Sequence, residues 1–219
     1  MTAPAAIEVR GLGKRRGGRW VVDDVSFTVA AGEVVALAGG NGAGKTTVLA
    51  MIAGVLEPDR GWIALAGEPA HRRRRLGYVP EAADPPGHLT GAELLALCAA
   101  LRGGPPLDDE AARLLDVAAV APRRFDRMSL GQRRRACLAA ALIGAPRALV
   151  LDEPDNGLDA AGLDALATVV AHARERGAGV LVATHDPTIK DRLAGRTLLL
   201  DGGRLVDGGN PATDLAPPP

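Results

Sequence analysis

Three fully apolar runs recur along this chain and predict buried β-strands. They span residues 34–38, 148–151 and 180–183. Short runs without polar side chains are typical of central strands in a parallel sheet whose two faces are both covered. Segments with helical spacing separate these runs, so the pattern as a whole indicates an α/β fold.

Shorter, half-exposed strands are predicted near both ends of the chain. Residues 7–10 and 25–29 alternate between apolar and polar positions, and residues 61–66 form another strand-like segment. These segments predict a small β-rich flank around the first buried strand. Residues 198–200 and 204–206, joined by Asp-Gly-Gly, predict a hairpin.

Helical spacing dominates the middle of the chain. Residues 89–101 have apolar positions at helical intervals, and Thr90 with Glu93 forms a capping-box pattern at the start. Residues 108–120 are predicted as a second amphipathic helix. Because Pro- and Gly-rich stretches precede each of these segments, we expect a helical subdomain inserted into the core.

Composition narrows the class of protein. The 219 residues include 26 basic and 26 acidic side chains, a balance that argues against nucleic-acid binding. Cys98 and Cys137 lack metal-ligand spacing and are expected as buried, reduced cysteines. No apolar run approaches the ~20 residues that span a bilayer, and no signal peptide is evident. We therefore expect a cytoplasmic protein whose membrane role, if any, needs a partner chain.

The most specific chemical signal lies directly after the first buried strand. Residues 39–46 fit the pattern Gly-x-x-x-x-Gly-Lys-Thr between that strand and a helical segment. Glycines allow backbone N–H groups to surround an anion, and the helix N-terminus adds its positive dipole end. Lys45 supplies a charge for the β- and γ-phosphates of a nucleotide, and Thr46 offers a hydroxyl to Mg²⁺.

Polar residues follow the other two buried strands. Asp152 and Glu153 come directly after residues 148–151, and Thr184 and His185 follow the next strand. Ligand sites in parallel sheets lie beyond the carboxyl ends of the strands. We therefore expect Asp152 to face the Mg²⁺ and Glu153 to polarise a water for attack on the γ-phosphate, with His185 as a γ-phosphate contact.

A second anion cradle is predicted at the start of the helical segment 133–143. Ser129 and the free N–H groups of that helix N-terminus can face an anion. One explanation for two cradles in one chain is that the second closes over nucleotide held by another subunit. The alternative is that Ser129 is an ordinary N-cap.

Taken together, these motifs resemble the ATP-binding subunits of ATP-binding cassette (ABC) transporters, over residues 7 to about 207. The similar segments are the Walker A loop at 39–47, the Q-loop at 77–81, the signature Leu-Ser-Gly-Gly-Gln at 128–132, Walker B with its catalytic glutamate at 149–153, the D-loop at 156–159 and the switch histidine, His185. Among such subunits, the chain looks most like export-type and haem-exporter-like ATPases.

The resemblance implies a fold and a division of the chain. The fold is a P-loop NTPase (RecA-like) core with a mixed, mainly parallel sheet, an antiparallel β flank and an inserted helical subdomain. Residues 1–82 and 144–208 would form the core, residues 83–143 the helical subdomain, and residues 209–219 a disordered tail.

The resemblance also implies roles for individual residues. The implied catalytic residues are Glu153, His185 and Glu81, and the implied Mg²⁺ ligands are Thr46, Asp152 and Glu81. The implied ATP-binding residues are Gly39, Asn41, Gly42, Ala43, Gly44, Lys45, Thr46, Thr47, Arg16, Ser129, Gly131 and Gln132.

Two kinds of partner are implied. A homodimer or heterodimer of ABC subunits would sandwich ATP head to tail, with Ser129 and Gly131 completing the site built on Lys45 of the other subunit. A separate integral membrane permease would hold the dimer at the inner face of the cell membrane. Closure of the dimer on ATP would drive this permease.

The chain departs from the family pattern at several positions. Glu81 stands where the family usually has Gln, Met128 and Leu130 alter the signature, and Gly40 replaces a common proline. Arg16 falls where the family has an adenine-stacking aromatic, and its planar guanidinium could stack instead. Trp20 is nearby, at the predicted start of a strand.

A second function class is a soluble ABC ATPase that acts on nucleic acid or ribosomes. Such proteins carry paired cassettes, coiled coils or basic extensions, which this sequence lacks. The basic run 71–75 has two interpretations, an anionic ligand or a solvated face near the permease. Transport is therefore the main prediction, and no nucleic-acid partner is expected.

Overall fold

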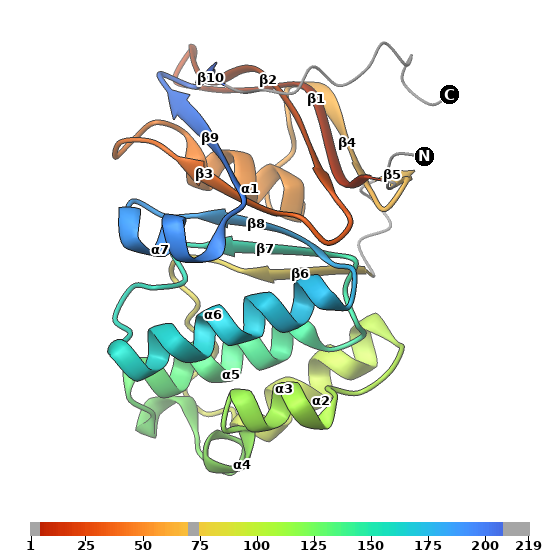
Figure 1. Cartoon of the computed structure of the whole chain (residues 1–219), viewed down its shortest axis with the longest axis vertical. Helices are drawn as coiled ribbons and strands as arrows, with labels where there is room; N and C mark the ends of the chain where they lie inside the picture. The colour runs from red at the N-terminus through yellow and green to blue at the C-terminus, as the bar shows by residue number, and fades with distance from the viewer. Residues whose placement is uncertain (1–4, 70–74, 208–219) are drawn as a thin grey trace.

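The computed structural model describes residues 5–69 and 75–207, arranged as two sheets with helices between and below them (Figure 1). Most of the basic run 71–75 and the predicted tail 209–219 lie outside the described residues.

A six-stranded, mainly parallel sheet forms the centre of the molecule. Its strand order is β10-β9-β3-β8-β7-β6; β9 and β10 pair antiparallel, whereas the other neighbours run parallel. The strands are β3 (Val34–Ala38), β6 (Leu76–Val79), β7 (Ala148–Asp152), β8 (Gly179–Ala183), β9 (Arg196–Asp201) and β10 (Arg204–Asp207). The three buried strands and the terminal hairpin predicted from the sequence are confirmed.

Both faces of this sheet are covered, which explains the uninterrupted apolar runs. In β7, Ala148 and Val150 pack on the side of α1 (Lys45–Ala53) and the flanking sheet, whereas Leu149 and Leu151 pack toward the helical layer. All four side chains are fully buried. A polar side chain in a strand buried on both faces would need a hydrogen-bond partner. Apolar and polar residues therefore do not alternate in this strand.

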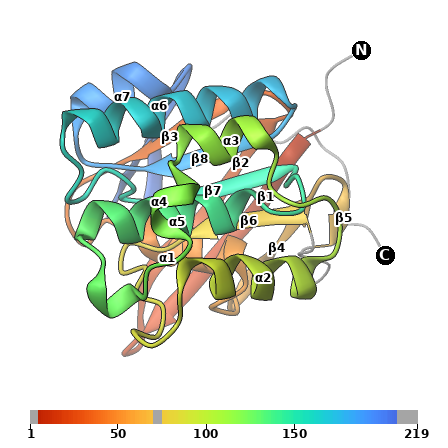
Figure 2. The same cartoon turned by 90° about the horizontal axis from the view of Figure 1, so that it is seen from below.

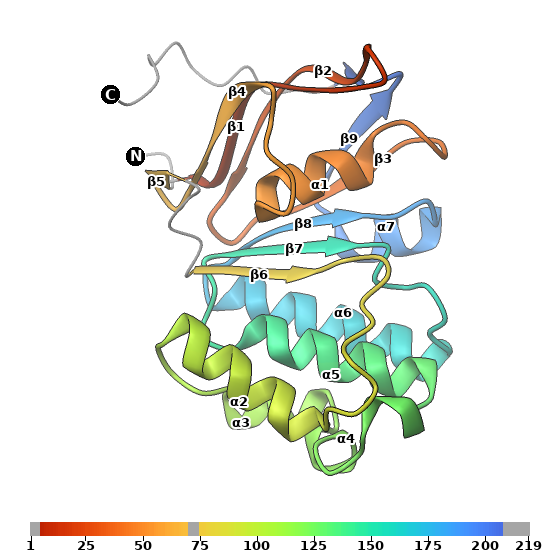
Figure 3. The ribbon, with the colours of Figure 1, turned by 180° about the vertical axis from the view of Figure 1, so that it is seen from behind.

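An antiparallel sheet flanks the core, as predicted. Its order is β2-β1-β4-β5, and α1 lies between it and the central sheet (Figure 3). Its strands are β1 (Ala5–Arg16), β2 (Arg19–Ala30), β4 (Arg60–Leu65) and β5 (Glu68–Pro69). The first two strands are longer than the alternating segments, because their ends continue into a hairpin whose outer residues are exposed.

Helices cover the opposite face of the central sheet in two layers (Figure 2). The elements are α2 (Gly91–Arg102), α3 (Asp109–Leu114), α4 (Val117–Val120), the 3₁₀ turn η2 (Phe125–Arg127), α5 (Leu130–Leu142), α6 (Ala160–Glu175) and α7 (Pro187–Leu193). The predicted capping box of α2 is present, since Thr90 accepts from the N–H of Glu93 and Glu93 accepts from the N–H of Thr90. Within the described ranges, every helix is too short or too polar to cross a membrane.

The prediction of one continuous helix over residues 108–120 is wrong. The chain breaks between α3 and α4, where Asp116 adopts a left-handed conformation with φ 49°. Leu115 and Val120 are both fully buried in the same cluster that holds α5. In a straight helix these two positions would point about 140° apart, so the break allows both to pack inward.

Candidate active site

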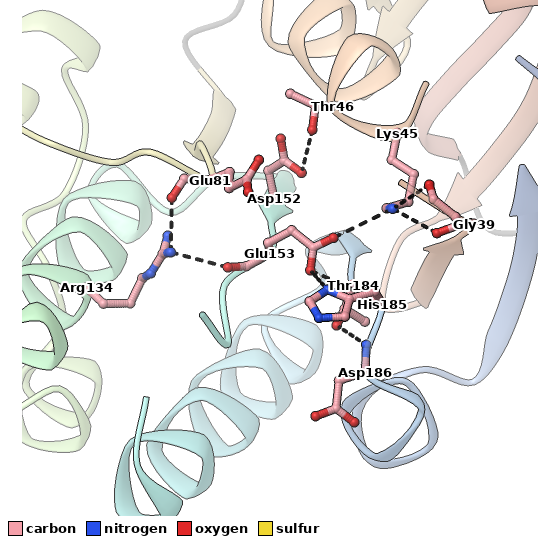
Figure 4. A network of polar contacts seen from close by, with 11 residues as sticks. Gly39, Lys45, Thr46, Glu81, Arg134, Asp152, Glu153, Thr184, His185 and Asp186 are labelled. Atoms are coloured by element: carbon pink, nitrogen blue, oxygen red, sulfur yellow. Dashed lines mark hydrogen bonds and ion pairs between the residues drawn. The ribbon is translucent and has the colours of Figure 1, made fainter. Parts of the chain in front are cut away.

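The carboxyl ends of four parallel-sheet strands meet at one edge of the central sheet. Beyond β3 lies the glycine loop, beyond β6 Glu81, beyond β7 Glu153, and beyond β8 His185 (Figure 4). The loops from β3, β6 and β7 line a cavity of about 330 Å³. Its lining residues are Arg16, Val21, Gly40, Asn41, Gly42, Ala43, Gly44, Lys45, Thr46, Thr47, Glu81 and Glu153.

The glycine loop leads directly into α1. Gly44 is the N-cap residue with φ 106°, and no side chain caps the helix. A Cβ at this position would lie 2.7 Å from the carbonyl oxygen of Val21, so only glycine fits without a shift of the backbone. The uncapped first turn of α1 therefore presents N–H groups and a positive dipole end to the cavity.

Lys45 points back across the glycine loop. Its Nζ donates to the carbonyl of Gly39 at 2.9 Å and to that of Gly40 at 3.3 Å, and lies 3.7 Å from Glu153 Oε1. The side chain is buried, so its charge is balanced mainly by these three groups. A phosphate in the cavity can replace them, because it offers stronger acceptors to the same ammonium group.

Asp152 and Thr46 form the candidate Mg²⁺ site. Thr46 Oγ1 lies 3.4 Å from Asp152 Oδ1, and Asp152 Oδ2 is buried with no hydrogen-bond partner. Burial, with the charges of Glu81 and Glu153, raises the pKa of Asp152 to about 6, although the hydrogen bond from Thr46 lowers it. An unpartnered buried carboxylate oxygen beside a hydroxyl suits a hard cation, so the residues fit Mg²⁺.

The protein supplies few of the ligands that such a cation needs. Among the described residues, no cluster of three or more acidic, histidine or cysteine side chains could hold a metal ion by itself. Mg²⁺ usually keeps several waters and binds one or two carboxylates together with substrate phosphates. Glu81 lines the same cavity and acts on Asp152 through its charge, and its predicted role as a ligand stays a prediction.

Glu153 is held between Lys45 and His185. Glu153 Oε2 lies 2.8 Å from His185 Nδ1 and also accepts from the backbone N–H of His185 at 3.3 Å. This hydrogen bond and the charge of Glu153 raise the pKa of His185. Glu153 itself is buried and has φ 44°, an uncommon conformation for a non-glycine residue, which turns its carboxylate toward the glycine loop.

Arg16 lies in the cavity wall, whereas Trp20 does not. The guanidinium groups of Arg15 and Arg60 stack on the Trp20 ring, 4.2 and 4.4 Å from its centroid. The ring is thus already engaged by cation–π contacts within the β flank. Among the lining residues, Arg16 is the one that carries a planar guanidinium.

The signature residues occupy a different hollow. Ser129 is the N-cap of α5 and forms a capping box with Gln132, which is the alternative interpretation that the sequence left open. Ser129 and Gly131 line a separate cavity of about 400 Å³ with residues of the segment 157–165. The structure therefore does not bring Ser129, Gly131 or Gln132 to the glycine loop of the same chain. Their predicted contact with nucleotide of another subunit stays a prediction.

Leu130 packs on the D-loop segment. A Cβ added to Gly157 would lie 2.0 Å from Leu130 Cδ2, and Gly157 has φ 75°. The leucine that replaces a glycine of the signature thus fills space that any larger residue at position 157 would need.

Sequence reasoning missed two polar residues beside the site, the buried Arg134 and the half-buried Asp155. Arg134 on α5 reaches the backbone of Glu81 and Glu153, and Asp155 has a buried Oδ1 without a hydrogen-bond partner. The signal for Arg134 was available, because Arg133, Arg134 and Arg135 are consecutive and a helix must turn one of three such side chains inward.

Comparisons with known proteins agree with this geometry. The family described as "ABC transporter" matches residues 22–156. "Nod factor export ATP-binding protein I" of Burkholderia lata is 37% identical over 220 residues, which cover 94% of this chain and 71% of the relative. "Hemin import ATP-binding protein HmuV" of Nocardia farcinica is 38% identical over 236 residues, covering 98% and 82%.

A solved structure is similar as well. "Structure of ATP binding subunit of ABC transporter" superposes with a TM-score of 0.86 at 30% identity, covering 94% of this chain and 90% of that chain. The predicted fold is confirmed, and transport is confirmed over the nucleic-acid alternative. The names of the relatives include both export and import.

Replacing Lys45 with Ala should weaken ATP binding by about tenfold or more, because it removes the charge that faces the phosphates. Equilibrium titration with a fluorescent ATP analogue measures this loss. Lys190→Ala, on α7 and outside the cavity lining, is the matched control and should bind as the wild type does. Equal affinities for both variants would remove Lys45 from the site.

Replacing Asp152 with Asn should stabilise the protein without nucleotide near neutral pH. The folded-state pKa of Asp152 is raised from 3.8 to about 6, so the wild type loses stability as pH rises through this window. We expect a gain on the order of 1–3 kcal/mol in the free energy of unfolding above about pH 6, shrinking toward zero near pH 4. Urea unfolding across this range measures it, and a destabilised variant near neutral pH contradicts the raised pKa.

Proposed function

The chain belongs to the ABC transporter family as an ATP-binding subunit, an ATPase coupled to transport, and we propose that Glu153 is the general base of its hydrolysis reaction. The observation that carries this proposal is the position of the Glu153 carboxylate. It lies at the cavity edge, contacts both Lys45 and His185, and is aimed by an uncommon backbone conformation. A buried carboxylate beside a phosphate loop can accept a proton from an attacking water.

ATP would bind through the glycine loop and α1. Backbone N–H groups of residues 40–46 would surround the β-phosphate, and Lys45 would exchange its contacts with Gly39 and Gly40 for phosphate oxygens. Since Glu153 is one of the groups around Lys45, this exchange would free the Glu153 carboxylate to face a water. Phosphate binding and exposure of the base would then be one event.

Mg²⁺ would be held by Asp152 and the Thr46 hydroxyl, the two residues that fit it. When bound, it would supply positive charge that offsets the negative charge developing on the phosphate. Asp152 must be ionised for this role, and because its pKa is raised to about 6, a cation that binds below that pH would have to displace a proton. Glu81, across the cavity, would orient water or the cation.

Hydrolysis would then be an in-line displacement. Glu153 would orient a water whose oxygen forms a bond to the γ-phosphorus while the bond to the β–γ bridging oxygen breaks. The water proton would pass to Glu153, and ADP and inorganic phosphate would leave. His185 is more than half exposed and hydrogen-bonded to Glu153. It would hold the Glu153 carboxylate in place and approach the γ-phosphate from the side of β8.

The signature residues support a head-to-tail dimer. Ser129 and Gly131 lie at the capped N-terminal end of α5, in a hollow that shares no lining residue with the glycine-loop cavity of their own chain. A second copy, or a related ABC subunit, would present its bound nucleotide to this end of α5. Closure of the two subunits on ATP would drive a separate membrane permease, which would hold the pair at the inner face of the membrane.

Glu153→Gln should lower kcat for ATP hydrolysis by about a hundredfold or more while the Kd for ATP changes by less than about threefold. The amide keeps the shape and cannot accept the proton, whereas Lys45 and Thr46 are unchanged. Steady-state phosphate release and nucleotide titration give the two quantities. Glu175→Gln, an exposed position of α6, should leave both unchanged. Turnover of Glu153→Gln at the wild-type rate would exclude Glu153 as the base.

Arg16→Ala should weaken ATP binding by about threefold to tenfold if the guanidinium supports the adenine, and Arg16→Tyr should preserve or improve it. Arg19→Ala removes the same charge from the same hairpin outside the cavity and is the control. Competition between ATP and GTP measures base preference. If Arg16→Ala binds as the wild type does and still prefers ATP, another residue holds the base.

A further inference from the structure

Arg134 is a buried cation whose direct partners are backbone carbonyls. It is 4% exposed, and its guanidinium donates to the carbonyls of Pro80, Glu81 and Glu153 at 3.2, 3.1 and 3.2 Å. Figure 4 shows the bonds to Glu81 and Glu153. Burial lowers its pKa, while the more distant carboxylates of Asp155, Glu81 and Asp152 oppose this change. Burying a guanidinium is costly, so its place between two loops needs a physical reason.

The two loops that Arg134 joins both carry proposed site residues. Pro80 and Glu81 follow β6, and Glu153 follows β7. The carbonyl of Glu153 also accepts from the N–H of Asn156 at 3.2 Å, and the backbone N–H of Glu153 donates to the carbonyl of Ala183 at 2.9 Å. These bonds fix a backbone with φ 44°, which persists only where the surroundings over-determine it.

Arg134 also belongs to the helix that begins at the signature. It lies on α5, which Ser129 caps, so a shift of that helix end moves the guanidinium. Neighbouring residues tie α5 to the same loop, since Arg133 forms an ion pair with Asp84 at 3.2 Å. α5 is therefore a physical connection between Ser129 and the backbone of Glu153.

We propose that Arg134 is a positioning residue that couples the signature end of α5 to Glu81 and Glu153. The proposal rests on Glu153 as the general base. A change at Ser129, such as the approach of another subunit's nucleotide, would alter the orientation of the base through one side chain. Arg134 thus sets the rate of hydrolysis and leaves the affinity of the glycine loop for ATP unchanged.

Arg102 offers a matched comparison within the same chain. Its guanidinium donates to the carbonyls of Ala140, Ala141 and Ile143, at the other end of α5. It is also partly buried, and its pKa is lowered by burial. The two arginines share their chemistry and the number of backbone acceptors, but Arg102 is the last residue of α2, and its hydrogen bonds go to the C-terminal end of α5 and not to Glu81 or Glu153.

The test compares Arg134→Met, Arg134→Lys and Arg102→Met in the full chain. We expect Arg134→Met to lower kcat by about tenfold or more with the Kd for ATP within about threefold of wild type. Arg134→Lys should give a smaller loss, because an ammonium lacks the fork that reaches both loops. Arg102→Met should lower the melting temperature without changing kcat by more than about twofold.

Amide hydrogen exchange supplies a second readout. Exchange in residues 80–84 and 153–157 should rise in Arg134→Met and stay at the wild-type level in Arg102→Met. If Arg134→Met and Arg134→Lys both keep wild-type kcat, or if kcat and ATP affinity fall together, the proposal is overturned. If Arg134→Met does not fold, Arg134→Lys decides: wild-type kcat and exchange overturn the proposal, and reduced kcat at unchanged affinity supports it.

A double variant separates this proposal from the assignment of the base. If Arg134 acts through Glu153, Arg134→Met should cause no further loss in the Glu153→Gln background. Independent, multiplicative losses would overturn the coupling while leaving Glu153 as the base. Wild-type turnover by Glu153→Gln alone would instead overturn the base assignment.

Discussion

The parallel pairing of β6, β7, β8 and β3 is the constraint on which the rest of the structure depends. It brings four loops from distant parts of the chain to one edge, in a fixed register such as Val35 beside Leu181 and Leu149 beside Val180. A slip of one residue would turn Leu149 and Leu151 from the helical layer toward α1. The positions of Lys45, Asp152 and Glu153 relative to one another are therefore set by the hydrophobic packing of the strands that precede them.

That packing also brings like charges together. Glu81, Asp152, Glu153 and Asp155 repel one another at this edge, and burial raises the pKa of both Asp152 and Asp155. Lys45 on one side and Arg134 on the other supply the opposing charge. The site holds unfavourable electrostatic energy that a cation bound to phosphate can relieve, and this explains why strained and unpartnered groups persist there.

Much of this arrangement could be predicted from the sequence. The glycine loop, Asp152 and Glu153 were identifiable because each follows an apolar run of recognisable length, and strand ends of a parallel sheet share an edge. Arg134 was not identified, because a run of three arginines indicates an inward side chain without saying what it contacts, and its backbone-carbonyl partners carry no sequence signal. The break at Asp116 was missed because residues 108–120 contain no glycine or proline to mark it, and the packing of Leu115 and Val120 in the cluster that holds α5 decides the geometry.

Leu130 and Gly157 show how two family motifs have become interlocked in this chain. Because the leucine occupies the space beside the glycine, a larger residue at position 157 would force the exposed Leu130 side chain to move. A chimaera that takes its D-loop segment from a relative with a larger residue at position 157 therefore meets a constraint from the signature segment as well. The smallest portable unit in this part of the molecule is thus the pair of segments, joined by a contact between residues 27 positions apart in the sequence, 130 and 157.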